Sequence, residues 1–515
     1  MVNRSSALAF ALFIVTVPLA RLSAQDTSVN DKAPDPLNGS WTGILDTGVG
    51  KLRLILDFKR GDAWKAELDI PDQGAKDLPA DSVVYEDGKV VVQWKRIGAT
   101  YRGRLEAGAE RKSDKLTGVL VQGREFALDF VRSEVFVGAR RPQTPKPPFP
   151  YRVIELRYSH APTEDTAKTF RLEEAAAPEG DARANETAKE RVCLAGTLTL
   201  PRGDGPFPAV LLVSGSGPQD RDETIFDHKL FHVLADALTR RGIAVLRYDD
   251  RGIGASTGSF ATATTRDFAK DAHAGLLCLA QRADIDHKRL GIIGHSEGGI
   301  VGPMVAVTTD LVHFIVALGG TAVPGADVLQ HQMRLIGRAQ GMNEDKLEAG
   351  LRENRSLLDM VLEKALDEDR EEGEQTELRQ RVVKRLGDYY DEHPDERAGV
   401  SKQAFVQQRA ATLLSPWFRF FLAHDPRGDL RNLRCAFLGV FGEKDLQVDP
   451  AQNLDEMKAA LAKNERATVK VFPQLNHFFQ TADKGTPDEY RAIEETIAPA
   501  ALTYIVDWVV ETCRS

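Results

Sequence analysis

The residues best suited to do chemistry lie in the pentapeptide 294–298, Gly-His-Ser-Glu-Gly, which follows an apolar run at 290–293. A serine between two glycines in this setting is typical of a sharp strand-to-helix turn that exposes the serine hydroxyl. The glycines suit the turn because a Cβ at either position would obstruct the close backbone approach. The hydroxyl would stand at a helix N-terminus, where backbone N–H groups favour developing negative charge. The pattern predicts Ser296 as a nucleophile.

A serine nucleophile needs a base, and the chain offers eleven histidines. His477 follows the apolar stretch 468–472 and lies in a loop just ahead of the last predicted helix. His295 is adjacent to the nucleophile, so its side chain is expected to point away from the serine hydroxyl. Position along the chain therefore selects His477 as the base.

The base needs an acid that holds its imidazole in the correct tautomer and stabilises the imidazolium. The loop after the predicted strand 436–441 offers Glu443, Asp445 and Asp449. Glu443 lies too near the strand, and Asp449 precedes a proline in the manner of a helix cap. Asp445 is therefore the predicted acid. The resulting chain order is nucleophile, acid, base, which distinguishes this scaffold from other serine hydrolases.

An oxyanion hole requires two N–H donors. We expect one from the backbone of Glu297, directly after the nucleophile, and one from the loop 214–222, Ser-Gly-Ser-Gly-Pro-Gln-Asp-Arg-Asp. The glycines of this loop allow its amides to turn inward, and the N–H of Ser216 is the predicted donor. In isolation the same loop would be a plain Gly/Pro turn.

The glycine-rich segment 252–258 superficially resembles a dinucleotide-binding turn. Three charged residues separate it from the preceding strand and its third glycine is misplaced, which argues against that function. We expect instead a loop near the active site that is stabilised by Arg251 paired with Asp249 or Asp250.

The elements that must position these residues alternate between apolar strands and helices. Helices are predicted at 231–241 and 265–283. Strands are predicted at 194–200, 209–213, 244–248, 290–293, 314–318, 436–441 and 468–472. Such alternation predicts a mostly parallel sheet covered by helices on both faces, with the active site at the carboxyl ends of the strands.

The sequence predicts several further parts. Residues 36–138 read as a small antiparallel β domain, with a hairpin turn at Asp87-Gly88. Residues 139–160 read as a proline-rich linker. Residues 161–515 form the α/β domain, in which 322–425 is predicted as a helical cap insertion over the strand ends. Within the cap, the aromatic stretch 413–422 is suited either to line a pocket or to pack in the core.

Composition bounds the class of protein. The chain of 515 residues is too long for one core, and its net charge of −9 argues against a nucleic-acid partner. Residues 1–24 resemble a cleavable signal peptide, which predicts a secreted or periplasmic protein without stable membrane insertion, an uncleaved anchor being the alternative. The four cysteines could then pair or remain buried as small hydrophobic residues. Their spacing indicates no structural metal site.

Five stretches together resemble the α/β-hydrolase superfamily, in particular exported bacterial serine hydrolases of the serine-aminopeptidase-like (S33-type) esterase group. They are Ser-Gly-Ser-Gly-Pro-Gln-Asp-Arg-Asp-Glu (214–223), Val-Leu-Arg-Tyr-Asp-Asp-Arg-Gly-Ile-Gly (245–254), Gly-His-Ser-Glu-Gly-Gly (294–299), Gly-Glu-Lys-Asp-Leu-Gln-Val (442–448) and Leu-Asn-His-Phe-Phe-Gln (475–480). The resemblance implies an α/β-hydrolase fold with Ser296 as nucleophile, Asp445 as acid and His477 as base. It implies mechanism better than substrate, because the scaffold hosts many chemistries.

The expected function is a carboxylesterase that cleaves small or medium acyl esters through an acyl-enzyme, with no cofactor and no metal. The expected partner is a small-molecule ester. A serine aminopeptidase is the alternative enzyme, and it would need a carboxylate near the pocket for the substrate amine. A non-catalytic protein that binds a ligand through the β domain is the alternative from another class.

Overall fold

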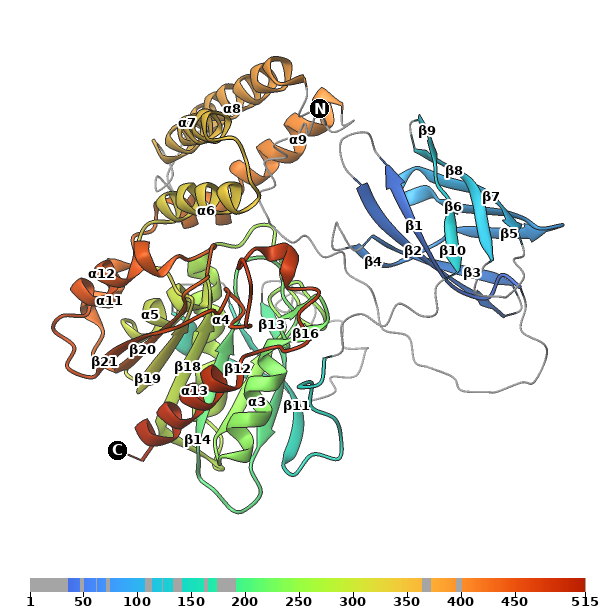
Figure 1. The fold of residues 1–515 in the computed structure, drawn as a ribbon. Coiled ribbons are helices and arrows are strands. Elements are labelled where there is room, and N and C mark those ends of the chain that lie inside the picture. The colour runs from blue at the N-terminus through green and yellow to red at the C-terminus, as the bar shows by residue number, and fades with distance from the viewer. Residues whose placement is uncertain are drawn as a thin grey trace. The chain divides into compact units, whose positions relative to one another are not determined.

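The computed structural model describes residues 36–46, 51–61, 63–70, 75–106, 114–122, 124–132, 141–161, 165–173, 191–363, 372–394 and 401–514. The chain forms two compact units, one of Met1–Gly138 with Asp388–Phe405 and one of Ala139–Gly387 with Val406–Ser515 (Figure 1). The expected signal peptide at 1–24 lies outside the described residues. Within the described ranges, no helix combines the length and apolar character needed to cross a bilayer.

The first unit contains an antiparallel sheet whose main strand order is β4-β3-β2-β1-β10-β8-β7-β6-β5, with β9 paired to β8 (Figure 1). Alternate residues of β2 and β3, among them Leu54, Leu56 and Leu68, point into its core, as a period of two requires. At the predicted hairpin, Asp87 and Gly88 both have positive φ. The strands are β1 (Gly39–Asp46), β2 (Lys51–Arg60), β3 (Trp64–Ile70), β4 (Ala75–Pro79), β5 (Ser82–Glu86), β6 (Lys89–Trp94), β7 (Ala99–Glu106), β8 (Lys115–Gln122), β9 (Arg124–Ala127) and β10 (Phe130–Arg132).

The second unit is built on a nine-stranded sheet of order β12-β11-β13-β17-β14-β18-β19-β20-β21. The strands from β17 to β21 in this order run parallel, and β11, β12 and β13 extend the sheet with antiparallel pairing. The strands are β11 (Arg152–His160), β12 (Arg171–Glu173), β13 (Val192–Leu200), β14 (Phe207–Val213), β17 (Ala244–Tyr248), β18 (Ile285–His295), β19 (Phe314–Leu318), β20 (Ala436–Gly442) and β21 (Ala467–Phe472).

All seven strands predicted for this unit are present, but the predicted linker 139–160 is wrong over its second half. Residues 152–160 are strand β11, which pairs with β13 along its whole length. Its first six residues are exposed or half-buried, and only Tyr158, Ser159 and His160 are buried. The strand therefore lacks the continuous apolar run that is typical of a buried strand. The prolines just before it were the stronger signal, and they favoured a linker.

Helices cover both faces of this sheet. One face packs against α4 (Thr265–Ala280), α5 (Gly298–Ala306), α11 (Arg427–Asn432) and α12 (Pro450–Ala460), and the other against α3 (Leu230–Arg240) and α13 (Pro499–Thr512). Alternation along β14 shows the division, because Leu211 lies in the first core and Leu212 in the second. The predicted two-sided α/β sheet is confirmed.

Between β19 and α11, the described residues form five helices with a small core of their own. They are α6 (Gly325–Ala339), α7 (Glu344–Leu362), α8 (Glu372–Glu392), α9 (Lys402–Leu413) and α10 (Pro416–Ala423). Phe418 and Leu422 of α10 are buried in that core, while Trp417 packs at its edge. The predicted helical insertion is present, and core packing accounts for part of its aromatic stretch.

Candidate active site

Ser296 lies in a strained turn between β18 and α5. Its φ is +53°, the left-handed region that a serine rarely adopts, and its N–H donates to the carbonyl of Leu318 at 2.8 Å. A Cβ at Gly294 would come within 2.0 Å of the carbonyl oxygen of Gly298, and one at Gly298 within 2.1 Å of that of Val213. Only glycine fits either position, so the predicted strand–turn–helix geometry is present.

His477 and Asp445 meet on the loops after β21 and β20. The His477 Nδ1 lies 2.7 Å from Asp445 Oδ2, and both side chains are almost fully buried. Asp445 Oδ1 accepts the backbone N–H groups of Gln447 at 2.9 Å and Val448 at 2.8 Å. The carboxylate is thus fixed on both oxygens and directs the Nδ1–H of the imidazole.

The other ring nitrogen of His477 forms no hydrogen bond with any described residue. An imidazole with Nδ1–H on a carboxylate and a free lone pair at Nε2 is arranged to accept a proton. The ring packs against Gly319, where a Cβ would lie 3.1 Å from both Cε1 and Nδ1. Gly319 directly follows Leu318, which accepts the N–H of Ser296, so the ring borders the serine turn.

The hydrogen bonds among the described residues do not include one between Ser296 Oγ and His477. The structure therefore joins the predicted acid and base directly, and it places the predicted serine at the end of β18, one strand removed from β20, without that last contact. Catalytic hydrogen bonds are often long or poorly aligned until substrate is bound.

The loop after β14 lies against the serine. A Cβ at Gly215 would stand 3.1 Å from the Cβ of Ser296. Within the described part of the chain, neither the Ser216 N–H nor the Glu297 N–H donates a hydrogen bond, so both predicted oxyanion donors are unengaged. Asp250 stabilises the loop at both ends, because its carboxylate accepts hydrogen bonds from the Ser214 hydroxyl and the Gln219 N–H, both at 2.9 Å.

The predicted pairing of Arg251 with Asp249 or Asp250 is wrong. Arg251 bonds the carboxylate of Asp271 on α4 through Nε at 2.7 Å and Nη2 at 2.8 Å. Asp249 instead holds Arg221, whose Nε and Nη2 donate to it at 3.0 Å and 2.8 Å. The partners lie on elements distant in sequence, which the local charge pattern did not reveal.

The rejected acids also have clear roles. Asp449 caps α12 by accepting the N–H of Ala451 at 3.0 Å, as its position before Pro450 predicted. Glu443 accepts the N–H of Gln474 at 2.9 Å and so helps to join the loops that carry the acid and the base.

The side chain of Glu297 adds a feature that the sequence analysis missed. Its buried carboxylate accepts the Thr265 hydroxyl at 2.7 Å and the indole N–H of Trp417 at 2.8 and 2.9 Å. Burial raises the pKa of the Glu297 carboxyl, and hydrogen bonds from Thr265, Trp417 and Ser216 offset part of that rise. Helix α10 is thereby tied to the residue after the serine. The aromatic stretch 413–422 was the only signal for this contact.

All four cysteines are free. Cys278, Cys435 and Cys513 are buried as small hydrophobic residues, and Cys193 is half-buried. Burial raises the pKa of Cys278 to about 12 and that of Cys435 to about 11, which keeps both thiols protonated.

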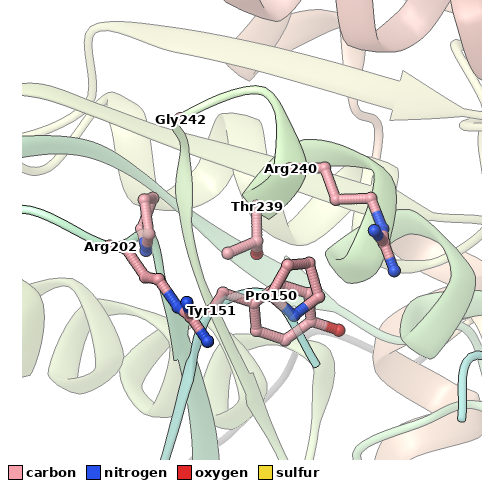
Figure 2. A pocket seen from close by; sticks show the side chains of 7 residues that line it. Pro150, Tyr151, Arg202, Thr239, Arg240 and Gly242 are labelled. Atoms are coloured by element: carbon pink, nitrogen blue, oxygen red, sulfur yellow. The ribbon is translucent and has the colours of Figure 1, made fainter. Parts of the chain in front are cut away.

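A pocket of about 410 Å³ lies away from these residues (Figure 2). It is lined by Pro150, Tyr151, Pro201, Arg202, Thr239, Arg240 and Gly242. Pro201 follows the end of β13 and Gly242 precedes β17, and these two strands run antiparallel. The pocket is therefore at the amino ends of the parallel strands, the edge opposite to Ser296, and it does not serve the serine site.

A parallel sheet with helices on both faces, a serine turn after β18 and a histidine–carboxylate pair on later loops define the architecture of α/β hydrolases. Residues 210–492 match the alpha/beta hydrolase family. Because that match covers more than half of the chain, the protein belongs to this family. The predicted fold class, an α/β-hydrolase fold preceded by a small antiparallel β domain, is confirmed.

Three proteins illustrate what the chain is similar to. Esterase EstD of Thermotoga maritima is 28% identical over 298 residues, which make up 58% of this chain and 61% of EstD. The matched part thus spans about three fifths of that relative. Among solved structures, the Pyrococcus furiosus esterase PF2001 has 15% identity and a TM-score of 0.36, covering 63% of this chain and 83% of that one. The alpha/beta hydrolase GrgF from Penicillium sp. sh18 has 17% identity and a TM-score of 0.37, covering 63% and 96%.

Proposed function

We propose that the protein is a serine carboxylesterase of the serine-aminopeptidase-like esterase group, acting on small or medium acyl esters. The observation that carries the proposal is the His477–Asp445 pair at 2.7 Å beside a serine held at positive φ. The naming of EstD as an esterase supports the same activity.

In the proposed reaction, His477 Nε2 takes the proton of the Ser296 hydroxyl as Oγ attacks the ester carbonyl carbon. The negative charge that forms on the carbonyl oxygen is stabilised by the N–H groups of Ser216 and Glu297. The C–O bond to the alcohol then breaks, and the imidazolium returns its proton to the departing oxygen. Water, deprotonated by His477, releases the acid from the acyl-serine and restores the hydroxyl.

The aminopeptidase alternative is less well supported. It needs a carboxylate that is open to a substrate ammonium, and Glu297 is the acid closest in sequence to Ser296. Both oxygens of Glu297 already accept hydrogen bonds from neutral donors, and the residue is 3% exposed. A substrate ammonium would have to displace Trp417, Thr265 or Ser216, so Glu297 is poorly suited to hold an N-terminal amine.

Two measurements test the proposal. Hydrolysis of p-nitrophenyl acetate and butyrate is compared with that of aminoacyl-p-nitroanilides, and a fluorophosphonate probe is mapped to its residue by mass spectrometry. We expect ester hydrolysis and labelling at Ser296, both abolished in Ser296→Ala. Activity on the anilides alone would support the aminopeptidase, and an unlabelled, inactive wild-type protein would support a ligand-binding function.

A further inference from the structure

A second buried histidine–carboxylate pair, formed by His295 and Glu223, adjoins the serine turn. The Nδ1 of His295 is 2.8 Å from Glu223 Oε1, and both side chains are at most 2% exposed. His295 is the residue before the nucleophile, and its ring lies 4.8 Å, centre to centre, from that of His477. The mechanism proposed above, on which this inference rests, uses neither residue.

This pair contacts each part of the proposed machinery. Glu223 Oε1 also accepts the N–H of Gly215, in the loop that carries Ser216, at 2.8 Å. His295 Nε2 lies 3.1 Å from the backbone carbonyl oxygen of His477. The oxyanion loop, the serine turn and the backbone of the base are therefore joined through one carboxylate and one imidazole.

The charge state of the pair follows from its partners. Both ring nitrogens of His295 face acceptors, so both hydrogen bonds form together only when the ring carries two protons. Burial opposes that charge, but the Glu223 carboxylate outweighs it and raises the pKa of His295. The second oxygen of Glu223 is buried and has no partner among the described residues, so its charge is balanced chiefly by His295. Glu223 also has φ +49°, a strained conformation that turns its side chain beneath the loop.

We propose that Glu223 and His295 are positioning residues, which hold the loop of Ser216 and the backbone of His477 in register with Ser296. Loss of the Glu223 charge leaves a neutral His295 with a single N–H. The unprotonated ring nitrogen of His295 then faces an oxygen, either that of the residue 223 side chain or that of the His477 carbonyl, and the hydrogen bond at that nitrogen is lost. A misplacement of the reacting groups by about 1 Å is enough to lower the rate about 100-fold.

His160 supplies a matched control. It is equally buried, one of its nitrogens lies 2.6 Å from Asp271 and the other 2.9 Å from the carbonyl oxygen of Ala161. The chemistry of the pair is the same, but Ala161 is not part of the proposed machinery. His295→Gln and His160→Gln therefore remove similar interactions, and only the first touches the residues that react.

The experiment measures kcat and KM for p-nitrophenyl butyrate in the wild type, His295→Gln, Glu223→Gln, the double variant and His160→Gln, per site labelled by a fluorophosphonate. We expect kcat to fall about 10- to 100-fold in His295→Gln and Glu223→Gln, with KM within threefold. The double variant should lose no more than the worse single variant, because the two residues act as a unit. His160→Gln should keep kcat within twofold.

Equal kcat in His295→Gln, Glu223→Gln and His160→Gln would overturn the inference, as would losses confined to KM. Should His295→Gln fail to fold, the isosteric Glu223→Gln decides the question alone. An inactive, unlabelled wild type would instead reject the proposed function and this inference with it, whereas an active wild type with unaffected variants would reject the inference only.

Discussion

His477–Asp445 and His160–Asp271 are two buried histidine–carboxylate pairs at the same edge of one sheet, and they differ in what surrounds them. The distances are nearly equal, 2.7 Å and 2.6 Å, and all four side chains are at most 4% exposed. Asp271 also holds Arg251, whereas the second oxygen of Asp445 accepts only backbone N–H groups. A short, buried pair is therefore no sign of catalysis by itself.

The decisive difference lies at the other ring nitrogen. His160 uses both nitrogens, one on Asp271 and one on the carbonyl of Ala161. His477 uses only Nδ1 and leaves Nε2 without a partner among the described residues. A base needs an unused lone pair, so the geometry qualifies His477 and disqualifies His160.

The largest expected effect comes from replacing each of the two histidines, in turn, by glutamine. His477→Gln should lower kcat for p-nitrophenyl butyrate about 10⁶-fold, because the serine then lacks its base. His160→Gln should leave kcat within twofold and lower the thermal midpoint, because Asp271 loses one buried partner. Rates per folded molecule, with folding checked by circular dichroism, decide the matter. Comparable losses in the two variants would remove the distinction.

The next effect tests the two carboxylates. Asp445→Asn should lower kcat about 10⁴-fold with the fold intact, because an amide in its place favours the wrong tautomer of His477. Asp271→Asn should act on stability instead, at up to about 3–5 kcal/mol, because Arg251 loses its hydrogen-bonded carboxylate and keeps only the longer ion pair with Asp267 at 3.9 Å. Urea unfolding and steady-state kinetics on both variants separate the two kinds of loss. A large kcat effect in Asp271→Asn would show that its network also governs the chemistry.

The sequence alone was enough to select His477 as the proposed base, but it did not indicate the partners of the other buried histidines. His477 follows a late apolar strand, and Ser296 lies in the Gly-x-Ser-x-Gly pattern, so motif and chain position were enough to propose both residues for the site. The partner of His160 lies 111 residues away on α4, and that of His295 lies 72 residues away. Such pairs depend on which faces meet in three dimensions, and the same limit explains the wrong partner predicted for Arg251.

The strands too were predictable only where the local sequence carries the signal. The buried strand β19 is apolar throughout, β17 is apolar except for Arg247, and the bounds of both were predicted without error. Strand β11 is largely half-exposed and follows a proline-rich stretch, so its sequence lacked the usual signal. Glu223 stands at the end of a recognised motif, yet its role depends on a positive φ that a sequence does not display.

The pH dependence of stability offers a smaller effect that sharpens the contrast between histidines. Glu223 raises the pKa of His295 against burial, with a further contribution from Asp445, whereas burial lowers the pKa of His228 to about 4. His228 faces the Thr496 hydroxyl and the Tyr490 carbonyl rather than an acid. The folded state therefore binds the His295 proton more tightly than the unfolded state does, and the His228 proton less tightly.

The expected signs are opposite. The stability from His295 is fully present below the unfolded value of 6.5 and is lost as pH rises through the folded pKa. The stability from His228 is present above 6.5 and is lost as pH falls from 6.5 towards 4. Unfolding free energies of the wild type, His295→Gln and His228→Gln between pH 4 and 9 test this, at about 1.4 kcal/mol per pH unit within each window. Differences that change in the same direction would contradict the assignment of partners.

The smallest effect concerns Glu297, a buried carboxylate with no histidine among its hydrogen-bond partners. Trp417→Phe removes the indole N–H that both Glu297 oxygens accept but retains a ring against Phe421, on which Trp417 stacks with centres 5.5 Å apart. A hydrogen bond of this kind contributes about 1.5 kcal/mol, so if that whole contribution is lost in the transition state, we expect kcat/KM to fall about tenfold. Trp508→Phe on α13, where the indole packs edge-on against Phe314, is the matched control and should keep kcat/KM unchanged. Equal rates in the two variants would mean that Glu297 needs only Thr265 and Ser216, and that α10 holds its place by apolar packing rather than through the carboxylate beside the serine.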